Sequence, residues 1–358
     1  MTARTIPGSL RGAGLAGRFR GRTALIGAIG LGLLFVLLVA GVSVGSTQIS
    51  PTDTLGVIVY RVTGLDLGST WTAATETIVW ELRLPRVLTA AVVGAGLAIA
   101  GATFQGIVRN PLADPYVLGT SSGAALGAAI GILLPVSLAA FQLGIVNALA
   151  FVGAIAAALL VFRVGGAGRA GGMTRLLLTG YAVGSILAAF LTMAMYVSGA
   201  NLRAIFTFLL GGLGGASWER LLIAAPLILA GCLLIAIRAR SLDGLLLGDA
   251  AARHLGIDVK RERGILLVLA SMTTAAAVAI TGLIGFVGLV VPHIVRLLVG
   301  APARRVIPIS AIAGACLLVA ADIVARLLGD LPVGVVMAML GAPFFLVLLA
   351  QTRSGYEL

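Results

Sequence analysis

The sequence predicts an all-α integral membrane protein: a single bundle of about ten transmembrane helices with both termini in the cytoplasm. Two features of composition favour this fold class, because 59% of the 358 residues are hydrophobic and only 11% are charged. An ordinary globular protein carries roughly a quarter charged residues. The third observation is the arrangement of the apolar residues. Runs of about 20, the length that crosses roughly 30 Å of hydrocarbon as a helix, recur along almost the whole chain.

The chain begins with a basic stretch, residues 1–23, which holds five Arg and no acidic residue. The apolar run 24–44 follows it. A signal peptide is the alternative interpretation, but this run exceeds an h-region of roughly 7–15 residues and no Ala-x-Ala cleavage site follows. We therefore expect a basic cytoplasmic tail over 1–23 and a single ten-helix transmembrane domain over 24–358.

Ten apolar runs qualify as membrane spans. In chain order they are 24–44, 87–107, 117–134, 143–162, 176–197, 221–237, 265–280, 284–299, 306–327 and 333–350. The seventh and eighth runs are short and are separated mainly by Gly282 and Leu283. An even number of spans returns the C-terminus to the side of the N-terminus.

The basic residues fix the orientation. Of the 25 Lys and Arg residues, 24 are Arg, and they lie in short segments between the apolar runs. With the N-terminus inside, 19 of the 25 fall on the cytoplasmic side, as the positive-inside rule expects. This distribution indicates membrane topology and contact with lipid headgroups, and it argues against a nucleic-acid partner.

Small residues recur at helix-packing intervals. Gly119, Gly123 and Gly127 repeat every four residues, and Gly94 and Ala98 do the same on the second span. Small residues at this spacing let helices approach closely in lipid. We expect these faces to be packing surfaces.

Two polar segments are longer than a connection requires. One, 46–84, is expected outside, and the other, 239–264, is expected inside. Long loops in compact proteins are usually functional or disordered. The stretch between Gly248 and Gly256 has a helix-forming composition, so we expect the inner segment to be ordered.

Residues for catalysis or cofactor binding are not apparent. There is no P-loop, and the single lysine, Lys260, has the wrong neighbours for one. His254 and His293 have no second ligand at helical spacing, and Cys232 and Cys316 lie in apolar runs. We therefore expect no cofactor, no metal site and no enzymatic activity in this chain; packing is the expected role of His293.

One acidic residue, Asp322, lies clearly within a span, with Arg326 four residues later. We expect an ion pair within one helix. A proton-coupled carrier moves protons along titratable side chains within the membrane, and a single acid that is already paired does not provide such a relay. Energy for transport is therefore expected from a partner subunit.

Seven motifs follow one another along the chain after the N-terminal tail. They are LRLPR at 82–86, QGIVRNPLADP at 105–115, LGTSSGA at 118–124, LGDAAARHLG at 247–256, GFVGLVVPHIVR at 285–296, LPVGV at 331–335 and GAPFF at 341–345. This ordered set resembles the membrane subunits of the iron-siderophore, haem and vitamin B12 importers, the FecCD-type permeases of type II ABC importers. The similarity covers nearly everything after the N-terminal tail.

The resemblance implies a multi-pass protein of the bacterial cytoplasmic (inner) membrane that forms a homo- or heterodimer with a second permease subunit. It also implies two cytoplasmic ABC ATPase subunits and an external substrate-binding protein. Ferric siderophore is the expected cargo, with cobalamin or haem as the alternative. A secondary exporter, which would work without the ATPase, and a purely structural membrane protein are the remaining alternatives from other classes.

Two groups of site residues follow from the resemblance. The expected ATPase-coupling residues, within 239–264, are Leu247, Gly248, Asp249, Ala252, Arg253, His254, Leu255 and Gly256. Arg83, Arg86 and Arg326 match arginines that dock the binding protein, a use that competes with the Asp322–Arg326 ion pair. The glycine-rich segment 198–220 falls where the family has a short re-entrant helix and an outer gate.

Overall fold

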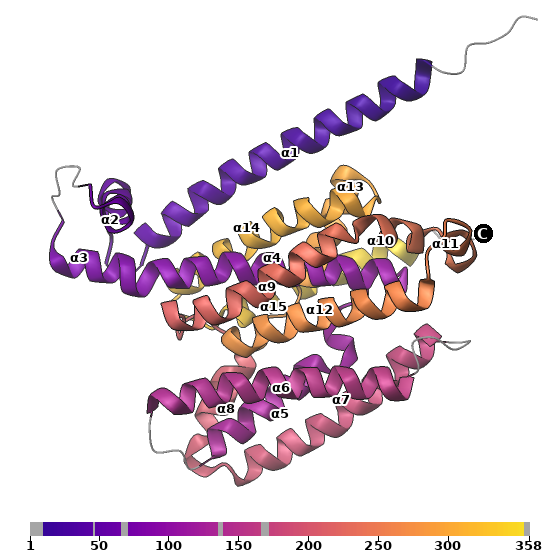
Figure 1. The fold of residues 1–358 in the computed structure, drawn as a ribbon. Helices are drawn as coiled ribbons and strands as arrows, with labels where there is room; N and C mark the ends of the chain where they lie inside the picture. The colour runs from indigo at the N-terminus through magenta and orange to yellow at the C-terminus, as the bar shows by residue number, and fades with distance from the viewer. Residues whose placement is uncertain (1–9, 46, 66–70, 135–138, 166–171, 354–358) are drawn as a thin grey trace, which may run out of the picture.

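The computed structural model describes residues 10–45, 47–65, 71–134, 139–165 and 172–353, and every regular element among them is helical (Figure 1). The longer helices are α1 (Leu10–Ser43), α2 (Pro51–Thr63), α4 (Leu84–Val108), α5 (Thr120–Leu133), α6 (Ala139–Gly165), α7 (Gly172–Val197), α9 (Trp218–Ile237), α12 (Val259–Thr281), α13 (Val287–Val299), α14 (Ala303–Leu327) and α15 (Val333–Arg353). The shorter ones are α3 (Ala73–Thr77), the π-helix η1 (Ile78–Arg83), η2 (Pro115–Leu118), η3 (Gly199–Asn201), α8 (Leu202–Leu210), α10 (Ala239–Leu246) and α11 (Asp249–His254).

Each of the ten predicted spans lies on a helix, so the predicted fold class is confirmed. Seven helical stretches are long and apolar enough to cross a membrane, and α5, α13 and α15 are shorter apolar helices. α8 is a further short apolar helix. The ends of the bundle differ, because α2 and α3 lie at one end and α10 and α11 lie at the other, and the N-terminal half of α1 extends away from the bundle (Figure 1).

Glycines set the closest helix contacts. α4 lies at the centre and packs against α14, α12, α13 and α9. A Cβ at Gly94 would overlap the carbonyl of Gly314 on α14, and one at Gly101 would overlap the backbone of Gly288 on α13. Backbones therefore touch where side chains would hold them apart.

The predicted glycine face of the third span packs against α6. Cβ atoms at Gly123 and Gly127 would overlap the backbone of Gly153 and of Leu149, respectively. Gly119 lies just before α5 with a φ of 73°, a conformation that glycine adopts at no steric cost. It therefore caps α5, and it also faces Gly180 and Gly184 of α7.

The polar segments are more helical than expected. The outer segment carries α2 and α3, and the helix of the second span already begins at Ala73, because Glu76, Glu81 and Arg83 interrupt its apolar pattern but not its backbone. The inner segment folds into α10 and α11, and α12 begins at Val259. α1 begins at Leu10, within the predicted basic tail; residues 1–9 lie outside the described part.

Candidate functional site

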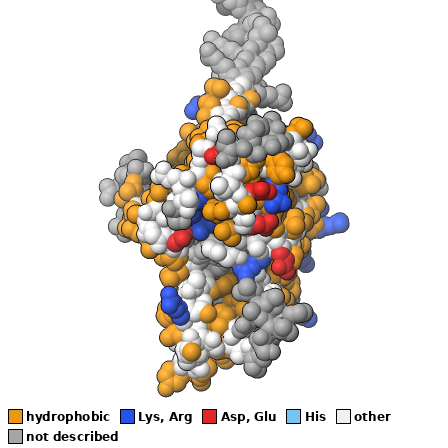
Figure 2. Space-filling model, turned by 90° about the vertical axis from the view of Figure 1, so that its left-hand side faces the viewer, with side chains coloured by type: hydrophobic (Ala, Val, Ile, Leu, Met, Phe, Trp, Pro, Cys, Tyr) orange, Lys and Arg blue, Asp and Glu red, His pale blue; other side chains and the backbone are white. Residues whose placement is uncertain are grey.

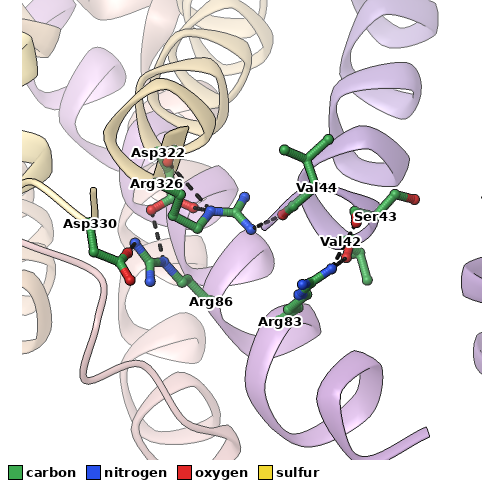
Figure 3. A network of polar contacts seen from close by, with 8 residues as sticks. All are labelled: Val42, Ser43, Val44, Arg83, Arg86, Asp322, Arg326 and Asp330. Carbon is green, nitrogen blue, oxygen red and sulfur yellow. Dashed lines mark hydrogen bonds and ion pairs between the residues drawn. The ribbon is translucent and has the colours of Figure 1, made fainter. Parts of the chain in front are cut away.

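Three arginines form a network at the end of the bundle that carries α2 and α3 (Figure 3). Arg83 ends η1, Arg86 lies in the first turn of α4, and Arg326 lies in the last turn of α14. The side chain of Arg86 is 15% exposed and that of Arg326 is 7% exposed. Arg83 as a whole residue is 7% exposed.

Arg83 holds the C-terminal end of α1. Its Nη1 donates to the carbonyls of Val42 at 3.0 Å and Ser43 at 2.7 Å, and its Nη2 donates to the carbonyl of Thr47. A Cβ at Gly45 would lie 2.6 Å from Arg83 Nη2. The guanidinium therefore satisfies carbonyls that a helix end otherwise leaves unpaired.

Asp322 joins the other two arginines. Its Oδ1 accepts from Arg86 Nε at 2.9 Å, and its Oδ2 pairs with Arg326 Nε at 3.1 Å. The predicted i,i+4 ion pair is confirmed, and Arg86 is a second partner that sequence spacing did not reveal. Arg86 Nη2 also pairs with the exposed Asp330 at 3.1 Å, and Arg326 Nη1 donates to the carbonyl of Val44 at 2.7 Å.

Within this network little positive charge is left free, because internal partners hold its three arginines. Figure 2, which faces this end, shows basic and acidic side chains next to one another rather than a patch of one sign. Among the described residues, Arg326 Nη2 is a buried donor without a hydrogen-bond partner. Docking of a binding protein on these arginines stays a prediction, and it requires a partner that competes with internal contacts.

The predicted coupling residues lie at the opposite end, around α10 and α11. Leu242 and Leu245 of α10 are buried, and Leu242 packs against Gly106 near the end of α4. Gly248 separates α10 from α11 with φ 109° and ψ 157°, a region that is essentially restricted to glycine. Ala252 is fully buried and fixes which face of α11 points inward.

Asp249 is clamped by arginines from two helices. Arg109, which ends α4, donates through Nη2 to Asp249 Oδ1 and through Nε to the carbonyl of Leu245 at 2.8 Å. Arg263 of α12 donates to the same Oδ1 at 2.8 Å. Burial raises the pKa of Asp249, but the hydrogen bonds and charges of Arg263 and Arg109 outweigh it, so the pKa lies below its ordinary value.

Two further contacts anchor α10. Asp243 accepts from the backbone N–H of Ala303 and pairs with Arg304 at 2.9 Å, which ties α10 to the first turn of α14. Arg238, at the start of α10, pairs with Glu262 of α12 at 2.6 Å. The segment is therefore fixed to α4, α12 and α14 together.

The clamped segment leaves an exposed surface. Leu247 is 69% exposed and Leu255 is 63% exposed, and Arg253, His254 and Gly256 are exposed around them. Sequence reasoning named these residues but missed their support, Arg109, Arg263 and Asp243. The only sequence signal for Arg109 was its place in a motif, because its partner lies 140 residues away.

Comparisons with known proteins give consistent matches over most of the chain. The model of the FecCD transport family matches residues 33–351. The hemin transport system permease protein HmuU of Yersinia pestis is 40% identical over 90% of this chain and 96% of its own length. The vitamin B12 import system permease protein BtuC of Vibrio cholerae is 42% identical over 80% of this chain and 87% of its own. A solved metal-chelate type ABC transporter in an inward-facing conformation superposes with a TM-score of 0.80 at 29% identity, covering 92% of this chain and 99% of that one.

Proposed function

Because the chain belongs to the FecCD transport family, we propose that it moves a bulky metal chelate inward across the cytoplasmic membrane with energy from a separate ATPase. It is a multi-pass permease subunit of the metal-chelate, haem and vitamin B12 type of ABC importer. The observation that carries the proposal is the coupling segment, α10 and α11. Its side chains Leu247 and Leu255 are exposed, and the ion pairs of Asp249 fix it to the bundle.

The α10–α11 segment transmits the motion of the ATPase subunits. Leu247 and Leu255 offer apolar side chains to a cleft of the partner, and burying a leucine side chain contributes about 1.5–3 kcal/mol. The Asp249 clamp links a push on α11 to both α4 and α12. Displacement of a short clamped helix then moves two core spans, a rigid-body transition of a common kind.

At the outer end, an external binding protein docks on the network of Arg83, Arg86 and Arg326. Arg86 already binds the exposed carboxylate of Asp330, which supports the capacity of this arginine to accept an acidic partner. A carboxylate of the binding protein takes the place of Asp330. Arg86→Gln removes this charge while Asp322 stays paired with Arg326, and it should lower cargo uptake if docking uses Arg86.

The cargo is a chelated metal, delivered to a pathway shared with a second permease subunit. The family resemblance favours a ferric siderophore, and the names of the relatives favour haem or cobalamin. All three candidates hold a metal inside an organic chelate, so they are separated by measurement rather than by the residues of this chain.

Uptake by cells tests the proposal. Cells with and without the chain are given labelled ferric siderophore, haemin or cobalamin, before and after ATP depletion. We expect chain-dependent, ATP-dependent accumulation of one of the three. Leu247→Asp with Leu255→Asp should reduce it about ten-fold, as loss of about 1.4 kcal/mol of coupling predicts.

Ala301→Asp serves as the control for an added aspartate, because it places one on another exposed residue, in the turn between α13 and α14. Uptake that persists after ATP depletion would contradict the importer. If the Leu247/Leu255 variant and the control take up equal amounts of cargo, the role of the coupling segment is contradicted but the importer function is not.

A further inference from the structure

A cavity of about 690 Å³ lies between α6, α9 and α12, beside the first turns of α9. α12 packs against both other helices, whereas the described parts of α6 and α9 have almost no contact with each other. Small residues line part of the gap, namely Gly144 and Ala148 on α6 and Ala276 and Ala279 on α12. The volume lies within the roughly 300–1,000 Å³ typical of small-molecule sites.

The cavity has an apolar wall. Phe151 of α6, Ile223 and Leu227 of α9 and Ile280 of α12 line it. Ile223 is 66% exposed and Leu227 is 45% exposed, so this wall continues into the membrane-facing surface of α9. A hydrocarbon chain fits such a wall, because it can enter from the bilayer without crossing water.

The rim of the cavity is polar and charged. It is formed by Asn147, Glu219 and Arg220 together with the glycine pair Gly214 and Gly215. Arg220 is half-buried, and within the described residues its guanidinium makes no hydrogen bond or salt bridge. A Cβ at Gly215 would lie 2.6 Å from Arg220 Nη1, so the glycine leaves room for the guanidinium at the rim.

Aromatic residues place the rim at the membrane surface. Trp218, next to Glu219, donates from Nε1 to the carbonyl of Trp80 at 2.8 Å, and the two rings are 5.2 Å apart. Tryptophan is enriched where the bilayer meets water. The charged rim thus lies at headgroup level, and the apolar wall lies at the level of the acyl chains.

We propose that this cavity binds a zwitterionic phospholipid whose headgroup is a phosphoethanolamine. Arg220 takes the phosphate, because a guanidinium matches phosphate oxygens with several donors. Glu219 takes the ammonium, and one acyl chain lies against Phe151, Ile223 and Leu227. A second copy of the chain is the less suitable occupant, because it would have to bury both rim charges.

Lipid retention by the full chain tests the proposal. The chain is placed in nanodiscs with equal phosphatidylethanolamine, phosphatidylcholine and phosphatidylglycerol, and bound lipids are counted by native mass spectrometry. We expect phosphatidylethanolamine to exceed phosphatidylcholine about ten-fold, since choline has no N–H to donate, a difference of about 1.4 kcal/mol. Arg220→Ala should reduce total phospholipid retention about ten-fold.

Two variants separate the contributions. Glu219→Gln should abolish the preference for ethanolamine over choline while phospholipid remains bound. Ala148→Phe should fill the cavity and expel the lipid with both charges intact. Arg203→Ala is the matched control, because it removes an exposed arginine on α8 that does not line the cavity.

The proposal is overturned if Arg220→Ala or Ala148→Phe retains as much lipid as the unmodified chain, or if Arg203→Ala loses as much. Preference for phosphatidylglycerol would also overturn it. The variant Ala148→Cys tests the alternative occupant by thiol labelling. If the introduced cysteine is protected from the reagent in lipid-free dimers but reacts in monomers, a second copy of the chain fills the cavity instead. Each readout is independent of cargo uptake.

Discussion

Arginine–aspartate contacts hold both ends of the bundle, but the two ends leave different surfaces for a partner. At the outer end, Asp322 is almost fully buried between Arg86 and Arg326, and the guanidiniums face inward. At the inner end, Asp249 is 40% exposed, and Leu247 and Leu255 project from the helix it anchors. The first arrangement fixes the positions of α1, α4 and α14. The second holds a small helix rigid while its apolar side chains stay free.

This difference predicts its largest effect on stability at Asp322. Asp322→Asn leaves Arg86 and Arg326 without their shared buried counter-charge, and breaking a buried pair costs about 3–5 kcal/mol. We expect a loss of this size in the free energy of unfolding, measured by denaturant titration in detergent. The double variant Asp322→Asn with Arg326→Gln should lose less than the sum of the single changes; strict additivity would contradict the network.

A smaller loss is expected at Arg83. Arg83→Leu removes the donor to three carbonyls at the end of α1, and hydrogen bonds to charged groups contribute about 1.5–3 kcal/mol. Because the contact joins α1 to the core, cysteine cross-linking between α1 and α14 should weaken together with stability. Unchanged cross-linking would mean that other contacts hold α1.

At Asp249 the expected effect moves from stability to coupling. Asp249→Asn should change the free energy of unfolding by about 1 kcal/mol or less, because the ion pairs are partly exposed. Cargo uptake should nevertheless fall several-fold, since α11 is released from α4 and α12. Arg263→Lys keeps one donor to Asp249 and should restore most of the uptake that Arg263→Ala loses; a purely steric role would not distinguish them.

The lowered pKa of Asp249 also predicts a pH response. A carboxylate with a depressed folded pKa contributes fully above its unfolded value of about 3.9 and loses that contribution as pH falls through the folded value. The clamp is therefore intact between about pH 6 and pH 8. The ratio of uptake between Asp249→Asn and the unmodified chain should stay constant over that range, and a titration within it would contradict the assigned ion pairs.

The smallest effect is expected at Asp330. Its side chain is 72% exposed, and exposed ion pairs contribute about 0–1 kcal/mol. Asp330→Asn should thus leave the unfolding transition within experimental scatter of the unmodified chain. A loss comparable to that of Asp322→Asn would mean that the outer network is not divided into a buried core and an exposed rim.

Hydropathy was sufficient to place the ten predicted spans on helices, because lipid selects apolar length. The orientation inferred from the arginines stays a prediction. The helix from Ala73 to Arg83 was missed because Glu76 and Arg83 find their partners, Arg61 and the carbonyls at the end of α1, through tertiary contacts that no local pattern contains. The i,i+4 pair of Asp322 and Arg326 was predictable from helical spacing. The contacts of Arg86 with Asp322 and of Arg109 with Asp249 join residues 236 and 140 positions apart, so they required the packing of α4.

The contact between Arg326 and the carbonyl of Val44 has a consequence for biosynthesis. The two residues are separated by 282 positions, and at about 5–20 residues per second a ribosome needs about 15 s to 1 min to make the intervening chain. During that interval α1 stands in the bilayer without one of its two arginine anchors. Its high hydropathy and mostly unburied surface suit a helix that must persist alone in lipid until the ninth span arrives.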